Sequence, residues 1–253
     1  MFGSAERKGG RIKGVNRRLS REEIKETRTT KEEAQEGITC KTESKRIKGA
    51  DMNADEILAS EEFKRCVDFH GHICPGLAIG YRASKAGLKH LHKGRAVDEE
   101  IVAIVENNAC GVDAVQVLTG CTFGKGNLIH KDHGKQVFTF LGRKSGKGIR
   151  VAKKAEAGER SKKHQELFGK VREETATDKE RKTFWEIHHK RSLEVLDKPT
   201  EALFSIRAVD IALPPKAIIE PSIVCDVCGE PAMASKLTEK NNRKICGDCL
   251  DDL

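Results

Sequence analysis

The stretch FHGHICPGLAIGYRASKAGLKHL, residues 69–91, joins a His-x-His-x-Cys motif to an amphipathic segment. The residues at helical spacing in that segment are mostly apolar, which predicts a helix with one buried face: Leu77, Tyr81, Ser84, Leu88 and Leu91. Pro75 suits the first turn of this helix, because the N–H that proline lacks would have no partner there. The sequence therefore places the His/Cys motif immediately before the N-terminus of a helix.

The motif supplies three side chains of the kinds that metals bind, His70, His72 and Cys74. In an extended segment alternate side chains share a face, so all three can point to one side. Cys74 falls at the predicted N-cap, where the helix dipole and free N–H groups favour a thiolate. Two imidazoles and a thiolate suit Zn, Fe, Ni or Cu, and we expect a transition metal of unidentified kind here. The alternative is a turn-capping histidine, a solvated histidine and a merely buried thiol.

Two further cysteines follow predicted elements and could complete this site. Cys110 follows an apolar, β-branched run that predicts a strand at 101–105, and Cys121 follows a short helix predicted at 112–118. Both cysteines lie in Gly-containing loops at element ends, where functional residues concentrate. Either is therefore a candidate additional ligand beside the motif.

Residues 120–126 resemble a phosphate-binding loop. They do not form a Walker A motif, because the spacing before the lysine is one residue short and glycine replaces the Ser or Thr that would hold magnesium. The segment is compatible with an anion-binding nest or with a flexible turn that exposes Lys125. The catalytic residues stay open at this point, with Cys74, Cys121 and Lys125 as candidates.

The remaining apolar runs predict strands and helices in mixed order. Strands are expected at 136–142, 148–152 and 203–213, and the first two are separated by residues suited to a hairpin turn. A capping box formed by Thr177 and Glu180 predicts a helix over 178–196. This mixture indicates an α+β core over residues 54–213, with a mixed or antiparallel sheet and packed helices.

The C-terminal segment carries two Cys-x2-Cys pairs separated by 17 residues. Four thiolates are the ligand set of tetrahedral structural zinc, which leaves no coordination position for a substrate. About 30 residues with so few large apolar side chains could not fold unaided. We therefore expect a zinc module of zinc-ribbon or treble-clef-like form over residues 222–253, after a linker at 214–221. Its ligands would be Cys225, Cys228, Cys246 and Cys249.

Composition limits what the rest of the chain can be. With 253 residues, 34% charged and 4% aromatic, it suits one medium domain with appendages. Residues 1–50 hold 14 Lys and Arg against 8 Glu and show almost no apolar periodicity, so we expect a basic, disordered tail over residues 1–53. A charged, exposed insertion is expected at about 143–180.

Location and partners follow from the same counts. The sequence has neither an apolar run of membrane-spanning length nor an apolar export block at its start, so we expect a cytoplasmic protein whose nine cysteines stay reduced. The basic segments could steer the chain toward an anionic partner or simply be solvated. They lack interleaved aromatic residues, so nucleic acid is not the partner we expect. The scarcity of aromatic core residues favours burial between subunits, and hence a homodimer.

Three segments together resemble the E-subunit family of formylmethanofuran dehydrogenase: residues 69–82, residues 106–116 (ENNACGVDAVQ) and residues 120–127 (GCTFGKGN). The resemblance covers about residues 55–210, and the C-terminal zinc module resembles that of longer members. It implies a dimeric α+β core with a Cys/His metal site at the His-x-His-x-Cys loop. It also implies a connection with the enzyme that makes formylmethanofuran from carbon dioxide in methanogenesis.

The resemblance leaves the activity open among three hypotheses. The chain has neither a Gly-rich molybdopterin domain nor a ferredoxin-like cysteine run, so it is not expected to carry the redox cofactors of that enzyme. It could be an accessory component or metal-binding partner of a formylmethanofuran dehydrogenase. It could instead be a stand-alone metalloenzyme at the His70, His72 and Cys74 site, or a nucleic-acid-binding regulator that uses the zinc module.

Overall fold

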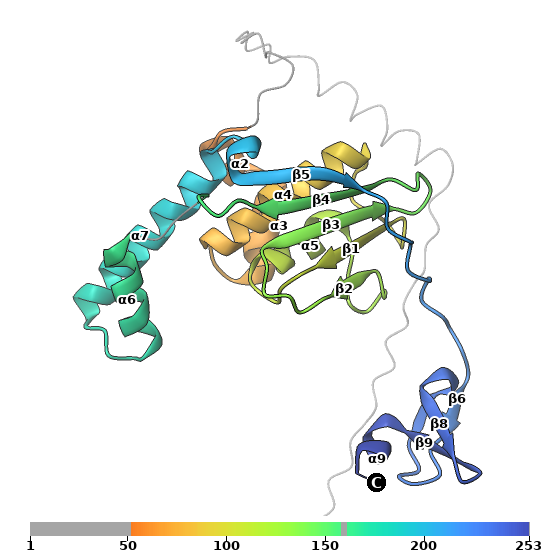
Figure 1. The fold of residues 1–253 in the computed structure, drawn as a ribbon. Helices are drawn as coiled ribbons and strands as arrows, with labels where there is room; N and C mark the ends of the chain where they lie inside the picture. The colour runs from red at the N-terminus through yellow and green to blue at the C-terminus, as the bar shows by residue number, and fades with distance from the viewer. Residues whose placement is uncertain (1–51, 158–160, 253) are drawn as a thin grey trace, which may run out of the picture. The chain divides into compact units, whose positions relative to one another are not determined.

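A computed structural model describes residues 52–157 and 161–252 of the chain. The predicted disordered tail, residues 1–53, lies almost entirely outside the described residues. Within the described ranges, strands and helices alternate irregularly along the chain (Figure 1). None of the helices in those ranges is long and apolar enough to cross a membrane.

The core is built on a five-stranded mixed sheet with strand order β2-β1-β3-β4-β5. The strands are β1 (Ile101–Val105), β2 (Leu128–His130), β3 (Val137–Gly142), β4 (Gly148–Lys153) and β5 (Phe204–Val209). Only the β1–β2 pair is parallel among these neighbours, and the other three pairs are antiparallel. The predicted β3–β4 hairpin is confirmed, whereas β2 was not predicted because three residues give too short a pattern. The α+β fold class with a mixed sheet is confirmed.

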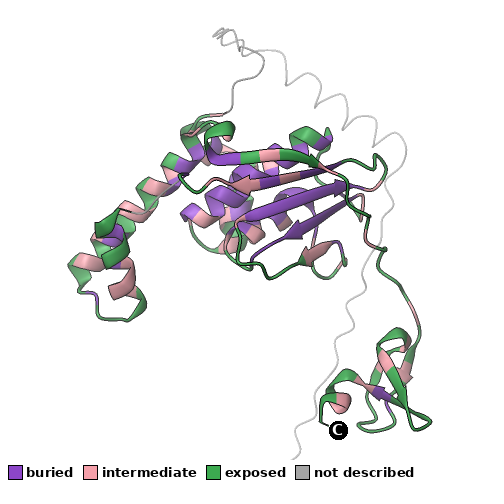
Figure 2. Cartoon of the chain, viewed as in Figure 1, coloured by how far each residue is buried: buried purple, intermediate pink, exposed green. Residues whose placement is uncertain are grey.

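Helices cover one face of this sheet (Figure 1). They are α2 (Ala54–Ala59), α3 (Glu61–His70), α4 (Pro75–Leu91) and α5 (Gly111–Thr119). Helix α4 packs on β3 and β4, and α5 packs on α4 and β1. The residues between the helices and the sheet form the main apolar core, shown as buried in Figure 2. The helix that begins beside the His/Cys motif is thus the central helix of the core.

A close approach of two helices at glycines fixes the position of α5 on α4. A Cβ atom added at Gly80 would lie 2.1 Å from the carbonyl oxygen of Gly111, which is the first residue of α5. Glycine at position 80 is therefore required for the two helices to pack so closely. This contact brings the N-terminal end of α5 against the first turns of α4, where the His/Cys motif ends.

The charged insertion contributes helices. After β4 come α6 (Lys162–Arg172), α7 (Asp178–Asp197) and α8 (Thr200–Leu203). The predicted helix over 178–196 is confirmed as α7, and its capping box is formed in both directions by Thr177 and Glu180. The C-terminal part of α7 packs against α4, with Val195 and Leu196 buried, while α6 packs on α7.

The C-terminal module consists of two small hairpins and a short helix. Its elements are β6 (Ser222–Val224), β7 (Pro231–Met233), η1 (Ala234–Lys236), β8 (Leu237–Lys240), β9 (Arg243–Cys246) and α9 (Gly247–Asp251). The second cysteine pair lies where β9 meets a helix, which corresponds to the treble-clef-like alternative. Among residues 222–252 only Cys225 and Ile245 are buried, as the mostly exposed module in Figure 2 indicates. So small an apolar core could not stabilise the module by itself.

Candidate metal centre

The His-x-His-x-Cys motif forms a compact loop between α3 and α4. His70 is the last residue of α3, and the chain turns at Gly71, whose φ of 94° is in the left-handed region that favours glycine. His72 lies in the loop, and Cys74 caps the N-terminus of α4. One ligand atom from each of His70, His72 and Cys74 lies within 4.8 Å of the other two. The three side chains that the sequence grouped therefore come together.

His70 is oriented by a carboxylate from α5. Its Nδ1 lies 2.7 Å from Oδ2 of Asp113, and its Nε2 lies 3.7 Å from Sγ of Cys74. An ionised carboxylate can only accept, so Nδ1 carries the proton and Nε2 keeps a lone pair facing the cysteine. A carboxylate that holds a ligating histidine in this way is typical of metal centres. The sequence did not predict this role for Asp113, although the residue lies one helical turn after Cys110.

Cys74 and Cys110 form a hydrogen-bonded pair of sulfurs. The backbone N–H of Leu77 donates to Sγ of Cys74 at 3.3 Å, as expected of an N-cap. The Cys74 thiol also donates to Cys110, which lowers the pKa of Cys110 to about 5, with a further contribution from His70. The same hydrogen bond, together with burial, raises the pKa of Cys74. The prediction that Cys74 carries the first thiolate is therefore wrong, because its thiol is the donor and Cys110 takes the charge.

Gly76 allows the two sulfurs to approach each other. A Cβ atom at this position would lie 3.0 Å from the Cβ of Cys110, and it would also contact the sulfurs of both cysteines. Because Gly76 is in the first turn of α4 and Cys110 precedes α5, any larger residue would push the helix ends apart. Cys110 is thus a neighbour of the motif, but it does not belong to the set of donors within 4.8 Å of one another.

The other candidate residues lie elsewhere. Cys121 is fully buried at the opposite end of α5, where its thiol donates to the carbonyl of Ile101 at 3.2 Å and burial raises its pKa to about 11. It cannot join the motif, so Cys110 is the better of the two candidate ligands. Lys125 donates to the carbonyl of Asp98 at 3.2 Å, and so it ties its loop to the segment before β1. This contact favours the turn interpretation of residues 120–126.

Trp185 of α7 lies next to the motif, which the sequence did not predict. Its ring centroid is 6.2 Å from that of His72, with the two rings nearly perpendicular. Trp185 is 49% exposed and also contacts the rings of Phe184 and His188 on its own helix. The charged insertion therefore supplies an aromatic side chain beside the exposed ligand. Sequence pattern gave no signal for this contact, because it joins residues more than 100 positions apart.

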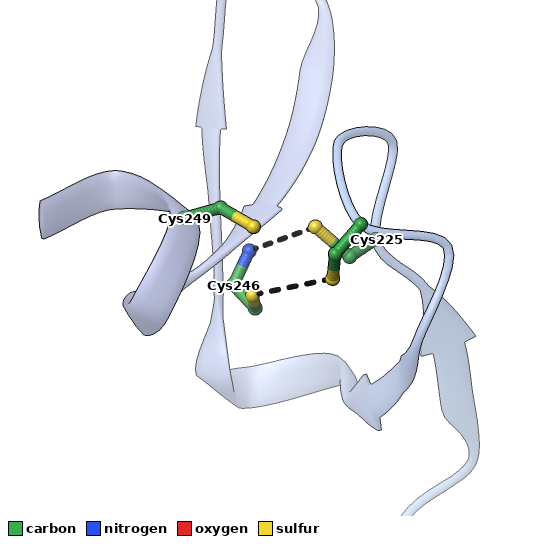
Figure 3. Close-up of side chains that lie close together, drawn as sticks. Cys225, Cys246 and Cys249 are labelled. Carbon is green, nitrogen blue, oxygen red and sulfur yellow. Dashed lines mark hydrogen bonds between the residues drawn. The ribbon is translucent and has the colours of Figure 1, made fainter. Parts of the chain in front are cut away.

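The second ligand cluster is in the C-terminal module. The sulfurs of Cys225, Cys228, Cys246 and Cys249 all lie within 4.8 Å of one another. Figure 3 shows two of their contacts: the backbone N–H of Cys246 donates to Sγ of Cys225 at 3.4 Å, and the sulfurs of Cys228 and Cys246 are 3.8 Å apart.

Backbone N–H groups of Cys228, Cys246 and Val227 lower the pKa of Cys225 to about 6, which favours the thiolate that a metal requires. Convergence of four sulfurs where apolar residues are scarce fits a tetrahedral structural metal. The cluster can therefore bind a metal such as zinc, through the four cysteines that the sequence indicated.

Known proteins share the core of this chain. The model of a family described as "FmdE, Molybdenum formylmethanofuran dehydrogenase operon" matches residues 69–205. A protein of Archaeoglobus fulgidus named "Probable S-adenosyl-L-methionine-binding protein" is 40% identical over 185 residues, which are 69% of this chain and 50% of that protein. The chain thus spans about half the length of this curated relative.

A solved structure has the same fold. It is the crystal structure of an FmdE-like protein of tungsten formylmethanofuran dehydrogenase from Syntrophus aciditrophicus. The two are 25% identical with a TM-score of 0.51, and the match covers 78% of this chain and 95% of that one. Because the family model extends over more than half of the sequence, from the His-x-His-x-Cys motif into β5, the chain belongs to the FmdE family.

Proposed function

We propose that this chain is a metal-binding protein with two distinct metals. The core site holds a transition metal through His70, His72 and Cys74, with Cys110 beside them, and the C-terminal module holds a structural zinc. The observation that carries the core site is the hydrogen bond between Asp113 and His70. It directs the unprotonated Nε2 of His70 toward Cys74, which is the arrangement a metal ligand needs.

The core site is proposed to keep a coordination position open. Three protein ligands leave room for water or substrate, whereas a fourth would make the site structural. The three donors that lie mutually close support the first arrangement, and the C-terminal cluster already offers a closed set of four. A metal in the core site would act as a Lewis acid on a bound oxygen. Cys110 would then stand next to the reacting group as a thiolate or a replaceable ligand.

Element analysis of full-length variants tests both sites. The wild-type chain is expected to carry two metal equivalents after purification without chelators. Cys74→Ser and Cys228→Ser should each lose one equivalent, from the core site and from the module respectively. Cys121→Ala is the matched control, since that buried thiol is outside both clusters, and it should retain two. A Cys74→Ser protein that still holds two equivalents would contradict the core site.

For its biological role, we propose an accessory protein of a formylmethanofuran dehydrogenase. The family description and the name of the Syntrophus aciditrophicus protein support this association. A tagged chain expressed in a methanogenic archaeon is expected to copurify with molybdenum- or tungsten-containing subunits. If it purifies alone while retaining the core metal, the stand-alone metalloenzyme becomes the better hypothesis. Nucleic acid is not proposed as a partner.

We also propose that the chain forms a homodimer in the cytoplasm. Large aromatic residues are exposed on the described surface, including Phe69 at 59% and Phe123 at 84%, and an interface between two copies would cover such residues. The clusters of reduced thiols suit a reducing compartment. Light scattering should give twice the mass of one chain, and a concentration-independent monomer mass would exclude the dimer.

The name of the Archaeoglobus fulgidus relative suggests S-adenosylmethionine as a second candidate ligand. Only half of that protein is matched, so its printed ligand need not belong to the shared half. The largest cavity in the described residues has an excess of cationic side chains at its rim, which disfavours a sulfonium cation. We therefore leave this ligand outside the proposed function and expect no binding heat when it is titrated into the full chain.

A further inference from the structure

A cavity of about 450 Å³ lies along the C-terminal half of α4, away from both ligand clusters. It extends between α4 and residues of α2, α5, α8 and β5. Cys74 precedes Lys89 by 15 positions on the same helix, so the core metal site and the cavity are separated by roughly 20 Å. The cavity is large enough for a small organic molecule. It has no part in the function proposed above.

The floor of the cavity is apolar and rigidly held. Ile57, Leu88 and Leu118 line it and are buried against the main core, as is Ala86. Arg82 fixes one wall, because its guanidinium donates to the carbonyl of Leu196 and, at 3.1 Å, to the hydroxyl of Thr200. Such a floor can bury the hydrocarbon part of a ligand without first having to be ordered.

The rim of the cavity is strongly cationic. Five basic side chains line the cavity (Arg82, Lys85, Lys89, Lys93 and Arg95), against the two acidic ones, Glu62 and Glu201. Glu62 already pairs with Lys85 at 2.7 Å. Lys89 and Lys93 are exposed on successive turns of the chain and pair with no carboxylate among residues 52–157 and 161–252. Two uncompensated ammonium groups thus stand at the mouth of an apolar cavity.

We propose that this cavity binds an amphipathic organic anion. The apolar body of the ligand would lie on Ile57, Leu88 and Leu118, and its carboxylate, phosphate or sulfonate group would be held by Lys89 and Lys93. An apolar molecule alone would leave the ammonium groups unused, and a cationic one would be repelled by them. The site and its ligand class are independent of either metal, so the metal experiments and this one can fail separately.

Two dyes with the same apolar body test the proposal on the full chain. 8-Anilinonaphthalene-1-sulfonate carries one sulfonate, and N-phenyl-1-naphthylamine lacks it. Fluorescence titration is expected to show one saturable sulfonate-dye site per chain, at least about ten times tighter than binding of the neutral dye. Equal affinity for the two dyes, or no saturable sulfonate-dye site, would overturn the proposal.

Charge reversal at the rim locates the site. The double variant Lys89→Glu/Lys93→Glu should weaken the sulfonate dye at least about tenfold and change the neutral dye little. The matched control is Lys144→Glu/Lys147→Glu, which reverses two exposed lysines in the β3–β4 turn and should leave both affinities unchanged. Equal loss in both double variants would mean that net charge alone attracts the dye, and this too would overturn the proposal.

A filled cavity gives an independent readout. Ala86→Leu places extra side-chain volume in the floor and should weaken both dyes, because each needs the apolar space. Circular dichroism and thermal unfolding of each variant establish that the fold is retained. If Ala86→Leu is folded and binds the sulfonate dye as tightly as the wild type, the dye lies elsewhere and the assignment is wrong.

Discussion

At the scale of single residues, Asp113 decides which nitrogen of His70 is available. Its carboxylate accepts from Nδ1, so the ring presents Nε2 to the neighbouring sulfur of Cys74. Gln116 on the next turn of α5 extends the same network to the other carboxylate oxygen. Asp113 is therefore a positioning residue that acts through His70 and makes no contact of its own with the proposed metal.

Replacing Asp113 tests this role. Asp113→Asn keeps the shape but removes the charge, so the core metal is expected to bind about 10 to 100 times more weakly, while the module metal is unaffected. Competition with a calibrated chelator measures both affinities in one titration. Asp98→Asn, at an exposed position before β1, serves as the control and should change neither. Unchanged core affinity in Asp113→Asn would show that the hydrogen bond is incidental.

Trp185 offers a direct optical report of the core site, since it is the only tryptophan in the chain. Its ring is 6.2 Å from that of His72, so an open-shell ion bound there should quench its fluorescence. Loading with Co²⁺ is expected to reduce emission strongly in the wild type and in Cys228→Ser, which keeps the core ligands. His72→Ala should lose most of the quenching. Equal quenching in His72→Ala would place the ion away from the motif.

At the scale of elements, two glycines in helices predict opposite effects of the same substitution. Gly80→Ala forces a Cβ to 2.1 Å from the backbone of α5, so it should destabilise the fold by about 3 kcal/mol. Gly169→Ala, inside α6, meets nothing within 4 Å and should stabilise that helix by about 0.5–1 kcal/mol. Urea unfolding compares the two variants. Similar stability of Gly80→Ala and the wild type would contradict the close packing of α4 and α5.

The joint between α6 and α7 should depend on pH through Glu180. This carboxylate contacts Lys170 and closes the capping box with Thr177, and these contacts lower its pKa to about 2. Because the pKa of the folded state is depressed, the contribution is fully present above the ordinary value of about 4.5. It is lost as the pH falls toward about 2.

Glu180→Gln provides the measurement. Amide hydrogen exchange in α6 and α7 should speed up between pH 4.5 and pH 2 in the wild type, beyond the intrinsic change in exchange rate. The variant should start with faster exchange and show a smaller pH dependence over this window. Identical profiles for both proteins would mean that Glu180 does not hold the two helices together.

At the scale of the whole molecule, the chain combines a core stabilised by burial with a module that depends on a metal. The main apolar cluster lies between the sheet and its helices, while the described part of the module buries only Cys225 and Ile245. Removal of the module metal should therefore unfold residues 222–253 and leave the core folded.

Limited proteolysis can separate the two behaviours. Cys228→Ser, or treatment of the wild type with a strong chelator, is expected to release the C-terminal segment rapidly and leave a stable fragment that contains the core. Cys66→Ala changes a buried core thiol instead and should leave the module resistant. A digestion pattern in Cys228→Ser that matches the wild type would show that the module folds without its metal.

The sequence by itself determined those features in which neighbours along the chain carry the information. The helix from Asp178 to Asp197, the hairpin of β3 and β4, and the start of α4 at Pro75 all follow from local periodicity, turns and capping. The grouping of His70, His72 and Cys74 and the pairing of the four C-terminal cysteines follow from short spacings. In each case a few consecutive residues fix the geometry, because backbone sterics act locally.

Only the tertiary structure decided which distant residues join the core site. The sequence could not choose between Cys110 and Cys121, because the two flank the same helix, and only the packing of α5 on α4 places Cys110 beside Cys74. The same packing brings Asp113 to His70 and gives the first negative charge to Cys110. These contacts join segments about 40 residues apart, and their geometry depends on how closely the helices approach, which no local pattern encodes.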